Sequence, residues 1–191
     1  MKLLVLDNYD SFTYNLVHMF RSMNIDHEVY RNDKISPEEA LSFDLIILSP
    51  GPGIPSEAGN MGKIIAACAG KKPILGICYG HQILAKKFGG KVKISKTREF
   101  GYAQIKSNKK CPLTKNFFKN KKNSVWMSHQ DIVTKIPYGF KKIASTQNSK
   151  FAIISNERKK FYGVQFHPEV THTENGTVIL KNFVLDICKT K

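Results

Sequence analysis

The sequence is poor in cysteine and has no long hydrophobic run. Its four cysteines form no C-x-x-C pair, so neither a zinc site nor a disulfide framework is indicated. No apolar run approaches the roughly 18 residues that cross a membrane, and Met1-Lys2 leads into a short strand instead of a secretory leader. We therefore expect a cytoplasmic protein with no metal and no membrane partner. The cysteines are Cys68, Cys78, Cys111 and Cys188.

Acidic residues are also scarce, since 15 Asp and Glu face 30 Lys and Arg and leave a formal net charge of +15. Such an excess suggests nucleic-acid binding, because basic patches neutralise phosphates. The sequence has no RNA-binding aromatic motif and no recognisable helix-turn-helix, and its cationic runs are mixed with Asn and Ser. We interpret them as a solvated basic face and expect no nucleic-acid partner. The runs are Lys109-Lys110, Lys115 to Lys122, Lys141-Lys142 and Arg158-Lys159-Lys160.

The first half of the chain alternates strand and helix patterns. With 191 residues, 41% of them hydrophobic, we expect one α/β domain spanning residues 1–191. The alternation predicts an open, mostly parallel twisted sheet with helices on both faces and a functional site at the carboxyl ends of its strands. The expected strands are Lys2 to Leu6, His27 to Arg31, Asp44 to Leu48 and the apolar run from Pro73. The expected helices are Phe12 to Met23, a short one capped by Ser36, Asn60 to Ala69 and His81 to Phe88.

After Gly89-Gly90 the pattern changes to shorter strands, which predict a smaller, β-rich antiparallel portion on the same core. We expect Lys115 to Asn123 to be a mobile surface connection and Gly176 to Cys188 to form a closing helix. The expected strands are Lys91 to Ile94, Tyr102 to Ile105, Ser124 to Met127, Lys142 to Ser145, Phe151 to Ser155 and Phe161 to Gln165.

The stretch from Pro73 to Gln82 carries the first chemical signal. Its apolar run ends in Gly76-Ile77-Cys78-Tyr79-Gly80 and then turns polar. A G-x-C-x-G turn between a strand and a helix is the thiol form of a nucleophile elbow, in which the glycines permit a strained turn. Cys78 would lie at a helix N-terminus, where the dipole favours a thiolate and the Tyr79 amide is free to bind an oxyanion. Taken alone, the stretch is equally compatible with a buried structural cysteine.

The second signal is Val164-Gln165-Phe166-His167-Pro168-Glu169, a strand pattern that ends abruptly in His, Pro and Glu. A catalytic thiolate needs an imidazole beside it, and the imidazole needs a carboxylate that fixes its tautomer and orientation. A lone His and Glu at a strand end would indicate only an exposed loop. The three groups together favour a triad of Cys78, His167 and Glu169, which only the fold can bring together.

These two motifs, G-I-C-Y-G-H-Q and V-Q-F-H-P-E, resemble those of the class I glutamine amidotransferases, which release ammonia from L-glutamine for a synthase partner. The resemblance covers essentially the whole chain. It implies that Cys78 is the nucleophile, His167 the acid and base, and Glu169 the residue that orients the imidazole.

The same resemblance implies two further groups of site residues. The backbone amides of Gly51 and Tyr79 would form the oxyanion hole. Gln82 and the segment Ser128-His129 would hold the α-amino and carboxylate end of glutamine. Gly51 lies in the Gly- and Pro-rich loop from Ser49 to Pro55, which follows an expected strand and therefore falls on the same edge of the sheet as the elbow.

The two ends of the chain resemble different subfamilies. Leu6 to Asn15 and Ser49 to Gly53 resemble the small subunits of anthranilate synthase and aminodeoxychorismate synthase. Arg98 to Tyr102, Val125 to Asp131 and His167 to Thr173 resemble the amidotransferase part of GMP synthetases. We give the second group more weight, because Arg98 to Tyr102 and Trp126 to His129 lie near the partner-facing mouth in the family. The favoured partner is thus an ATP-dependent XMP-aminating subunit, and a chorismate-binding subunit is the alternative.

Two other functions remain open at this point: a free-standing γ-glutamyl hydrolase that uses the same triad, and a binding or regulatory protein that keeps only the fold. The intact triad disfavours the second. The chain has no G-x-x-x-x-G-K-[ST] phosphate-binding loop, so we expect no cofactor here and ATP-dependent amination on another chain.

Overall fold

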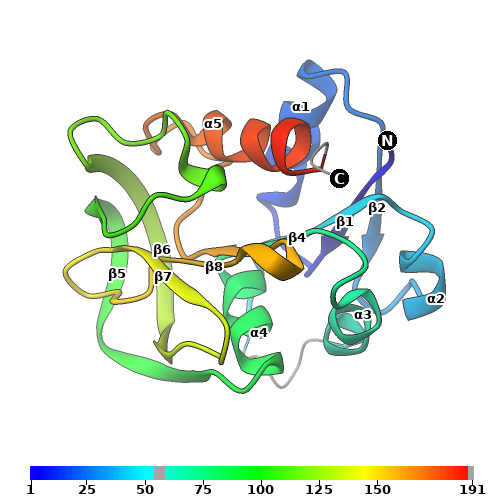
Figure 1. The fold of residues 1–191 in the computed structure, drawn as a ribbon, viewed down its shortest axis with the longest axis horizontal. Helices are drawn as coiled ribbons and strands as arrows, with labels where there is room; N and C mark the ends of the chain where they lie inside the picture. Colours follow the sequence, from blue (N-terminus) through cyan, green and yellow to red (C-terminus); the bar gives the residue numbers. More distant parts are fainter. Residues whose placement is uncertain (54–58, 189–191) are drawn as a thin grey trace.

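A nine-stranded sheet runs through the protein in the order β2-β1-β3-β4-β9-β8-β7-β5-β6 (Figure 1). The computed structural model describes residues 1–53 and 59–188. The first five strands of the order are parallel, and the remaining pairs are antiparallel. The parallel strands are β1 (Leu3–Asp7), β2 (His27–Arg31), β3 (Leu45–Leu48), β4 (Ile74–Ile77) and β9 (Phe161–Val164). The mixed α/β fold class predicted from the sequence is confirmed.

Helices cover both faces of the parallel strands (Figure 1). Alternate residues of β1 point to opposite faces, so Leu3 and Val5 join one buried cluster and Leu4 and Leu6 join another. The first cluster packs under α1 (Thr13–Ser22), α5 (Gly176–Lys181) and the π-helical turn Asn182–Ile187 that continues α5. The second packs under α2 (Pro37–Ala40), α3 (Met61–Cys68) and α4 (Tyr79–Lys87). Burial on both faces explains the continuous apolar runs of these strands.

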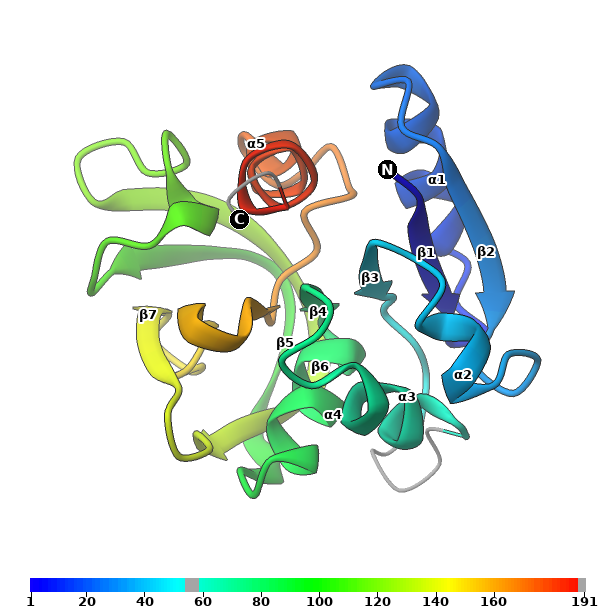
Figure 2. The same cartoon turned by 45° about the vertical axis from the view of Figure 1, so that its right-hand side comes forward.

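The antiparallel strands curl away from the parallel part (Figure 2). Two expected short strands, Lys91 to Ile94 and Tyr102 to Ile105, are one long strand, because β5 pairs with β6 on both sides of an irregularity between Ile94 and Glu99. The strands are β5 (Lys91–Ser107), β6 (Lys122–Lys135), β7 (Lys141–Ser145) and β8 (Ile153–Asn156), with 3-10 turns at Pro112–Thr114 and Glu157–Lys159.

The segment from Lys115 to Asn123 is anchored to the core, so its interpretation as a mobile surface connection is wrong. Phe117 is fully buried and stacks on Phe166 with ring centroids 5.6 Å apart. The Asn123 side chain donates to the carbonyl of Phe117 at 3.0 Å, and Asn182 donates to the carbonyl of Lys115 at 2.8 Å. Burying the Phe117 ring contributes about 2 kcal/mol, and the two side-chain hydrogen bonds hold the segment beside it.

The described helices are short. The longest, α1, has 10 residues. Within residues 1–53 and 59–188, none is both long enough and apolar enough to cross a membrane.

Candidate active site

Cys78 lies between β4 and α4 in the geometry expected of a nucleophile elbow. It is the N-cap of α4 and has φ 50° and ψ −100°, a conformation that is strained for a residue with a side chain. Both flanking glycines are required by close contacts. A Cβ on Gly76 would lie 2.5 Å from the carbonyl of Gly80, and a Cβ on Gly80 would lie 2.4 Å from the carbonyl oxygen of Leu48. The turn therefore packs tightly against β3 and holds the thiol at the carboxyl edge of the sheet.

His167 and Glu169 follow β9 and form a short, buried pair. Nδ1 of His167 lies 2.6 Å from Oε1 of Glu169, and both residues are at most 5% exposed. Main-chain contacts fix the histidine, because its N–H donates to the carbonyl of Trp126 at 3.0 Å and its carbonyl accepts from the Thr173 hydroxyl at 2.6 Å. The pair is thus held between β6 and the segment that leads to α5.

The charge state of His167 follows from its neighbours. Burial alone would lower the pKa of the imidazole, but its interactions with Cys78 and Glu169 outweigh burial and raise that pKa well above the usual value. The raised pKa therefore favours the protonated ring. A neutral imidazole with a raised pKa takes the proton of a neighbouring thiol at a helix N-terminus, and the resulting thiolate–imidazolium pair is the arrangement of an activated cysteine.

Asp10 and Phe12, in the segment after β1, also interact with this pair, although the sequence pattern predicted no role for either. The ring of Phe12 lies edge-on to His167 at a centroid distance of 5.6 Å. Burial raises the pKa of Asp10, whose carboxyl group interacts with both His167 and Glu169. Only their place near the carboxyl edge of the parallel sheet, where β1 ends beside β3, could have indicated this.

The two residues of the expected oxyanion hole lie side by side. A Cβ on Gly51 would approach within 2.5 Å of Asn8 Cβ and 3.2 Å of a Tyr79 ring carbon, so the loop after β3 lies directly on the start of α4. Gly51 belongs to the loop expected from Ser49 to Pro55, of which Ile54 and Pro55 lie outside the described residues. Gly51 thus lies against the Tyr79 ring, and the joint binding of one anion by the two N–H groups stays a prediction.

Asn8 holds this loop in place. Its main-chain N–H donates to the Ser49 hydroxyl at 2.9 Å, and its side-chain amide donates to the Ser49 carbonyl at 2.8 Å. Asn32 in turn donates to Asn8 Oδ1 at 2.9 Å. The motif from Leu6 to Asn15 thus has a structural use, since it connects the end of β1 to the loop that carries Gly51.

The residues expected to hold glutamine lie on the other side of the thiol. The carbonyl of Ser128 is 3.7 Å from Cys78 Sγ. Gln82 donates from Nε2 to the carbonyl of Asp131 at 2.7 Å, which ties α4 to β6. His129 is buried and faces that same Asp131 carbonyl through Nδ1 at 3.1 Å. Of these three residues the structure places Ser128 beside the thiol and brings Gln82 and His129 together at the Asp131 carbonyl, while their contact with glutamine stays a prediction.

Glu99 lies in the segment Arg98 to Tyr102, but its side chain does not share the exposed face of that segment. Strand alternation leaves Arg98, Phe100 and Tyr102 exposed but turns Glu99 inward, where it is 8% exposed and pairs with His129 across the ladder. Its Oε2 lies 3.0 Å from His129 Nε2 and accepts from the Ser149 hydroxyl at 2.7 Å. Burial opposes ionisation of Glu99, but these donors hold the pKa of its carboxyl below the usual range.

We expect Glu99→Gln to raise KM for glutamine roughly tenfold, equivalent to about 1.4 kcal/mol, with a smaller change in kcat. The neutral amide weakens the interaction that orients His129, which we expect to contact the substrate and not the reacting atoms. Steady-state glutaminase kinetics measure both constants. Glu28→Gln, a surface ion-pair partner of Lys2 on β2, is the matched control and should leave both unchanged. An unaltered KM for Glu99→Gln would contradict the assignment.

Two further polar side chains lie in the centre of the site without a predicted role. Gln165, part of the second motif, places Nε2 3.7 Å from Cys78 Sγ. His81 is fully buried, and burial lowers its pKa to about 3, so the ring is neutral. A Cβ on Gly163 would lie 2.4 Å from its Nδ1, so His81 packs against the backbone of β9. We interpret His81 as a packing residue, whereas Gln165 contacts the sulfur itself.

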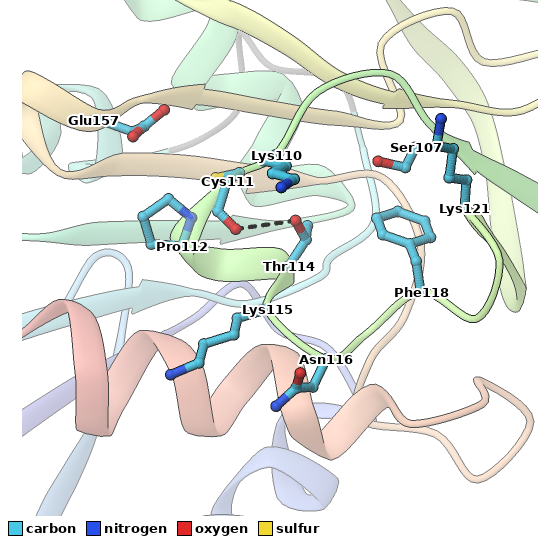
Figure 3. A pocket seen from close by; sticks show the side chains of 10 residues that line it. All are labelled: Ser107, Lys110, Cys111, Pro112, Thr114, Lys115, Asn116, Phe118, Lys121 and Glu157. Carbon is cyan, nitrogen blue, oxygen red and sulfur yellow. Dashed lines mark hydrogen bonds between the residues drawn. The ribbon is translucent and has the colours of Figure 1, made fainter.

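A cavity of about 620 Å³ lies elsewhere, beside the 3-10 turn after β5 (Figure 3). Three lysines line it, but Lys115 and Lys121 point away from each other in Figure 3 and do not converge on a common point. The Thr114 hydroxyl already donates to the Cys111 carbonyl at 3.1 Å. The lining therefore offers no focused charge. Within the described part of the chain, no cluster of three His, Cys, Asp or Glu side chains could hold a metal ion.

Comparison with protein families and curated sequences identifies similar proteins. The family model for glutamine amidotransferase class-I matches residues 4–187. The GMP synthase (glutamine-hydrolyzing) of Proteus mirabilis is 41% identical over 195 residues, which cover 98% of this chain and 37% of that protein. The corresponding enzyme of Aliivibrio salmonicida is 40% identical over 189 residues, covering 98% and 36%. The chain thus spans little more than a third of the length of these relatives.

Solved structures give the same result for a chain of similar length. A candidate GMP synthase subunit from Thermoplasma acidophilum superposes with a TM-score of 0.90 and 31% identity, covering 98% of this chain and 94% of that one. A glutamine amidotransferase from Thermotoga maritima has a TM-score of 0.82 at 16% identity, covering 100% and 99%, and this similarity concerns the fold alone.

Proposed function

Since the chain belongs to the class I glutamine amidotransferase family, we propose that it hydrolyses L-glutamine and passes the ammonia to a separate ATP-dependent subunit that aminates XMP. The observation that carries the hydrolysis is the strained elbow at Cys78 beside an imidazole whose pKa is raised and whose Nδ1 lies 2.6 Å from Glu169. These are the three groups that a thioester mechanism needs.

In the first half-reaction, the Cys78 sulfur attacks the carboxamide carbon of glutamine. The amides of Gly51 and Tyr79 stabilise the oxyanion that forms on the carboxamide oxygen. His167 donates its Nε2 proton to the leaving nitrogen as the C–N bond breaks, so ammonia leaves and a γ-glutamyl thioester remains on Cys78. Glu169 holds Nδ1–H throughout, which keeps the other ring nitrogen directed at the reacting atoms.

In the second half-reaction, the now neutral His167 accepts a proton from water through Nε2. The hydroxide adds to the thioester carbon, the same two amides stabilise the oxyanion, and the C–S bond breaks to release glutamate. The sulfur leaves as a thiolate beside the imidazolium, which is the charge state of the resting site. The cycle consumes glutamine and water and yields glutamate and ammonia.

Three observations support XMP as the acceptor that the partner binds. The relatives that match 98% of this chain at 40–41% identity are GMP synthases. A solved protein of matching length, 31% identical, is a candidate GMP synthase subunit. Asn8 belongs to the segment that suggested a chorismate-binding partner, but its hydrogen bonds to Ser49 give it a structural role. Its presence therefore does not favour a chorismate-binding partner. The alternatives are a chorismate-binding partner and a free-standing γ-glutamyl hydrolase, which differ in their response to a synthase.

The exposed face of β5 and β6 is the surface on which we place the partner. Phe100 and Tyr102 are 70% and 67% exposed and pack edge-on against Trp126 at centroid distances of 5.5 and 5.3 Å. This aromatic patch adjoins the site directly, because Phe100 pairs with Ser128 and the Trp126 carbonyl accepts from His167 N–H. A partner that covers these rings can therefore shift the strand that lines Cys78.

We expect the isolated chain to hydrolyse glutamine slowly and the XMP-aminating subunit of the same organism to stimulate it, most strongly with XMP and ATP present. Combined Arg98→Ala and Phe100→Ala substitution should reduce the stimulation about tenfold without altering the basal rate, because both side chains are exposed on the proposed docking face. Added salt should weaken association, since Arg98 and the neighbouring lysines are exposed cations. Glutamate release measures both rates.

Lys141→Ala, at an exposed position on β7, is the matched control and should respond like the wild type. Activation by a chorismate-binding subunit, with no response to the XMP-aminating one, would overturn the choice of acceptor. A high basal rate that no synthase changes would favour the free-standing hydrolase.

A further inference from the structure

We propose that Gln165 is a further catalytic residue of glutamine hydrolysis, which donates a hydrogen bond from its side-chain amide to the Cys78 sulfur. The inference rests on the proposed function of this site and adds to it a residue that touches the reacting atom. Gln165 immediately follows β9, is 1% exposed, and places Nε2 3.7 Å from Cys78 Sγ. A buried amide is costly unless its donors and acceptor are used, so its partners define its role.

Two hydrogen bonds fix which end of the Gln165 amide faces the sulfur, and the first of them is accepted by the main-chain carbonyl of Asp131. Gln82 Nε2 lies 2.7 Å from the carbonyl oxygen of Asp131, which can only accept, so this atom of Gln82 must be the nitrogen. The same nitrogen lies 3.3 Å from Gln165 Oε1, which accepts its second hydrogen. The Gln165 oxygen therefore faces Gln82, and its NH2 group faces the sulfur. The carbonyl thus resolves the ambiguity that amide side chains otherwise carry.

Three elements hold the donor at the sulfur. Gln82 comes from α4, Asp131 from β6 and Gln165 from the end of β9, where its own N–H donates to the carbonyl of Ala152 at 2.8 Å. The Gln165 side chain cannot turn away without leaving the second hydrogen of the Gln82 amide unpaired. The donor is thus positioned before substrate arrives, which is the condition for electrostatic stabilisation without reorganisation.

The contact distinguishes between the two charge states of the thiol. An N–H donor stabilises a thiolate more than a thiol, whereas the Ser128 carbonyl, 3.7 Å away, can accept only from S–H. The charged neighbour of the sulfur is His167, in the segment after β9. Asp10, in the loop after β1, interacts electrostatically with His167. Gln82, on α4, is uncharged. Gln165 therefore supports the anionic sulfur both before attack and when the thioester breaks.

The test is alkylation of the full chain by iodoacetamide from about pH 5 to about pH 10, with mass spectrometry of the Cys78 peptide. For Gln165→Met we expect the midpoint of alkylation to rise by about one pH unit, and kcat/KM at neutral pH to fall about tenfold with KM for glutamine little changed. Gln165→Glu should shift the midpoint further, because a carboxylate replaces the donor. The control Gln104→Met, at an exposed position on β5, should match the wild type.

An unchanged midpoint in folded Gln165→Met, or a smaller shift for Gln165→Glu than for Gln165→Met, would overturn the proposal. If circular dichroism shows that Gln165→Met does not fold, Gln165→Asn provides the test. Asparagine keeps the amide, but its side chain is one methylene shorter and the N–H no longer reaches the sulfur. The alkylation midpoint of Gln165→Asn must therefore also rise, and an unchanged midpoint would contradict the proposed hydrogen bond. A wild-type chain that releases no glutamate, alone or with any synthase subunit, would instead refute the proposed function, while the alkylation profiles would still report on Gln165.

Discussion

Replacing Cys78 with alanine should reduce glutamine hydrolysis at least about a thousandfold, because no other group at the elbow can form the γ-glutamyl thioester. The amides of the oxyanion hole and the residues that bind glutamine would remain, but without the thiol no thioester could form. Glutamate release by the purified chain measures the effect. In the complex with its synthase partner, added ammonium should still support amination, because it bypasses the thiol.

The other three cysteines provide the matched controls for this experiment. Burial raises the pKa of Cys68 and of Cys188 to about 11 and also raises that of Cys111, so these thiols stay protonated at neutral pH. Alanine at any of these positions should leave glutaminase activity intact. A glutamine-like electrophile should therefore label Cys78 alone. Near wild-type glutamate release by Cys78→Ala, or labelling mainly at another cysteine, would refute the proposed nucleophile.

His167→Ala should lower kcat about a thousandfold or more, whereas Glu169→Gln should lower it about a hundredfold. Loss of the imidazole removes the proton carrier from both half-reactions. Loss of the Glu169 charge leaves the carrier in place but weakens the 2.6 Å contact that orients Nδ1 and helps to raise the pKa of His167. The alkaline limb of the pH–rate profile, where the imidazolium loses its proton, should accordingly shift toward lower pH in Glu169→Gln, because the carboxylate that stabilises the imidazolium is gone.

Surface residues give the control for both substitutions. His27→Ala and Glu28→Gln remove the same groups from β2, the edge strand of the sheet, and both should leave kcat unchanged. If Glu169→Gln were more damaging than His167→Ala, the two roles would have to be reassigned.

Local signals were sufficient to predict the parallel half of the fold and the candidate triad. The apolar runs of β1, β3 and β4 are continuous because both of their faces are buried, and such runs are visible in the sequence itself. The glycines around Cys78 mark the elbow because any side chain there would collide with neighbouring backbone. His167 and Glu169 are two residues apart, so their pairing needs only a sharp turn at Pro168.

The inward turn of Glu99 and the burial of Phe117 were not predictable in the same way. Glu99 lies in a strand of mixed polar residues, and its face depends on the irregularity in the β5–β6 ladder, which shifts the alternation. A shift of one residue would have exposed it. Phe117 lies in a polar segment and acquires its partner, Phe166, only when the segment packs on the core.

The sequence by itself therefore determined the alternation of strands and helices, the elbow at Cys78 and the residue types of the triad, because each depends on neighbours within a few positions. Only the tertiary structure decided which groups surround the sulfur. The contacts of Gln165 with Gln82 and Cys78 join residues 83 and 87 positions apart, and that of Gln82 with Asp131 joins residues 49 apart. Such contacts depend on strand order and register, which are set by the packing of the whole sheet and not by any local pattern.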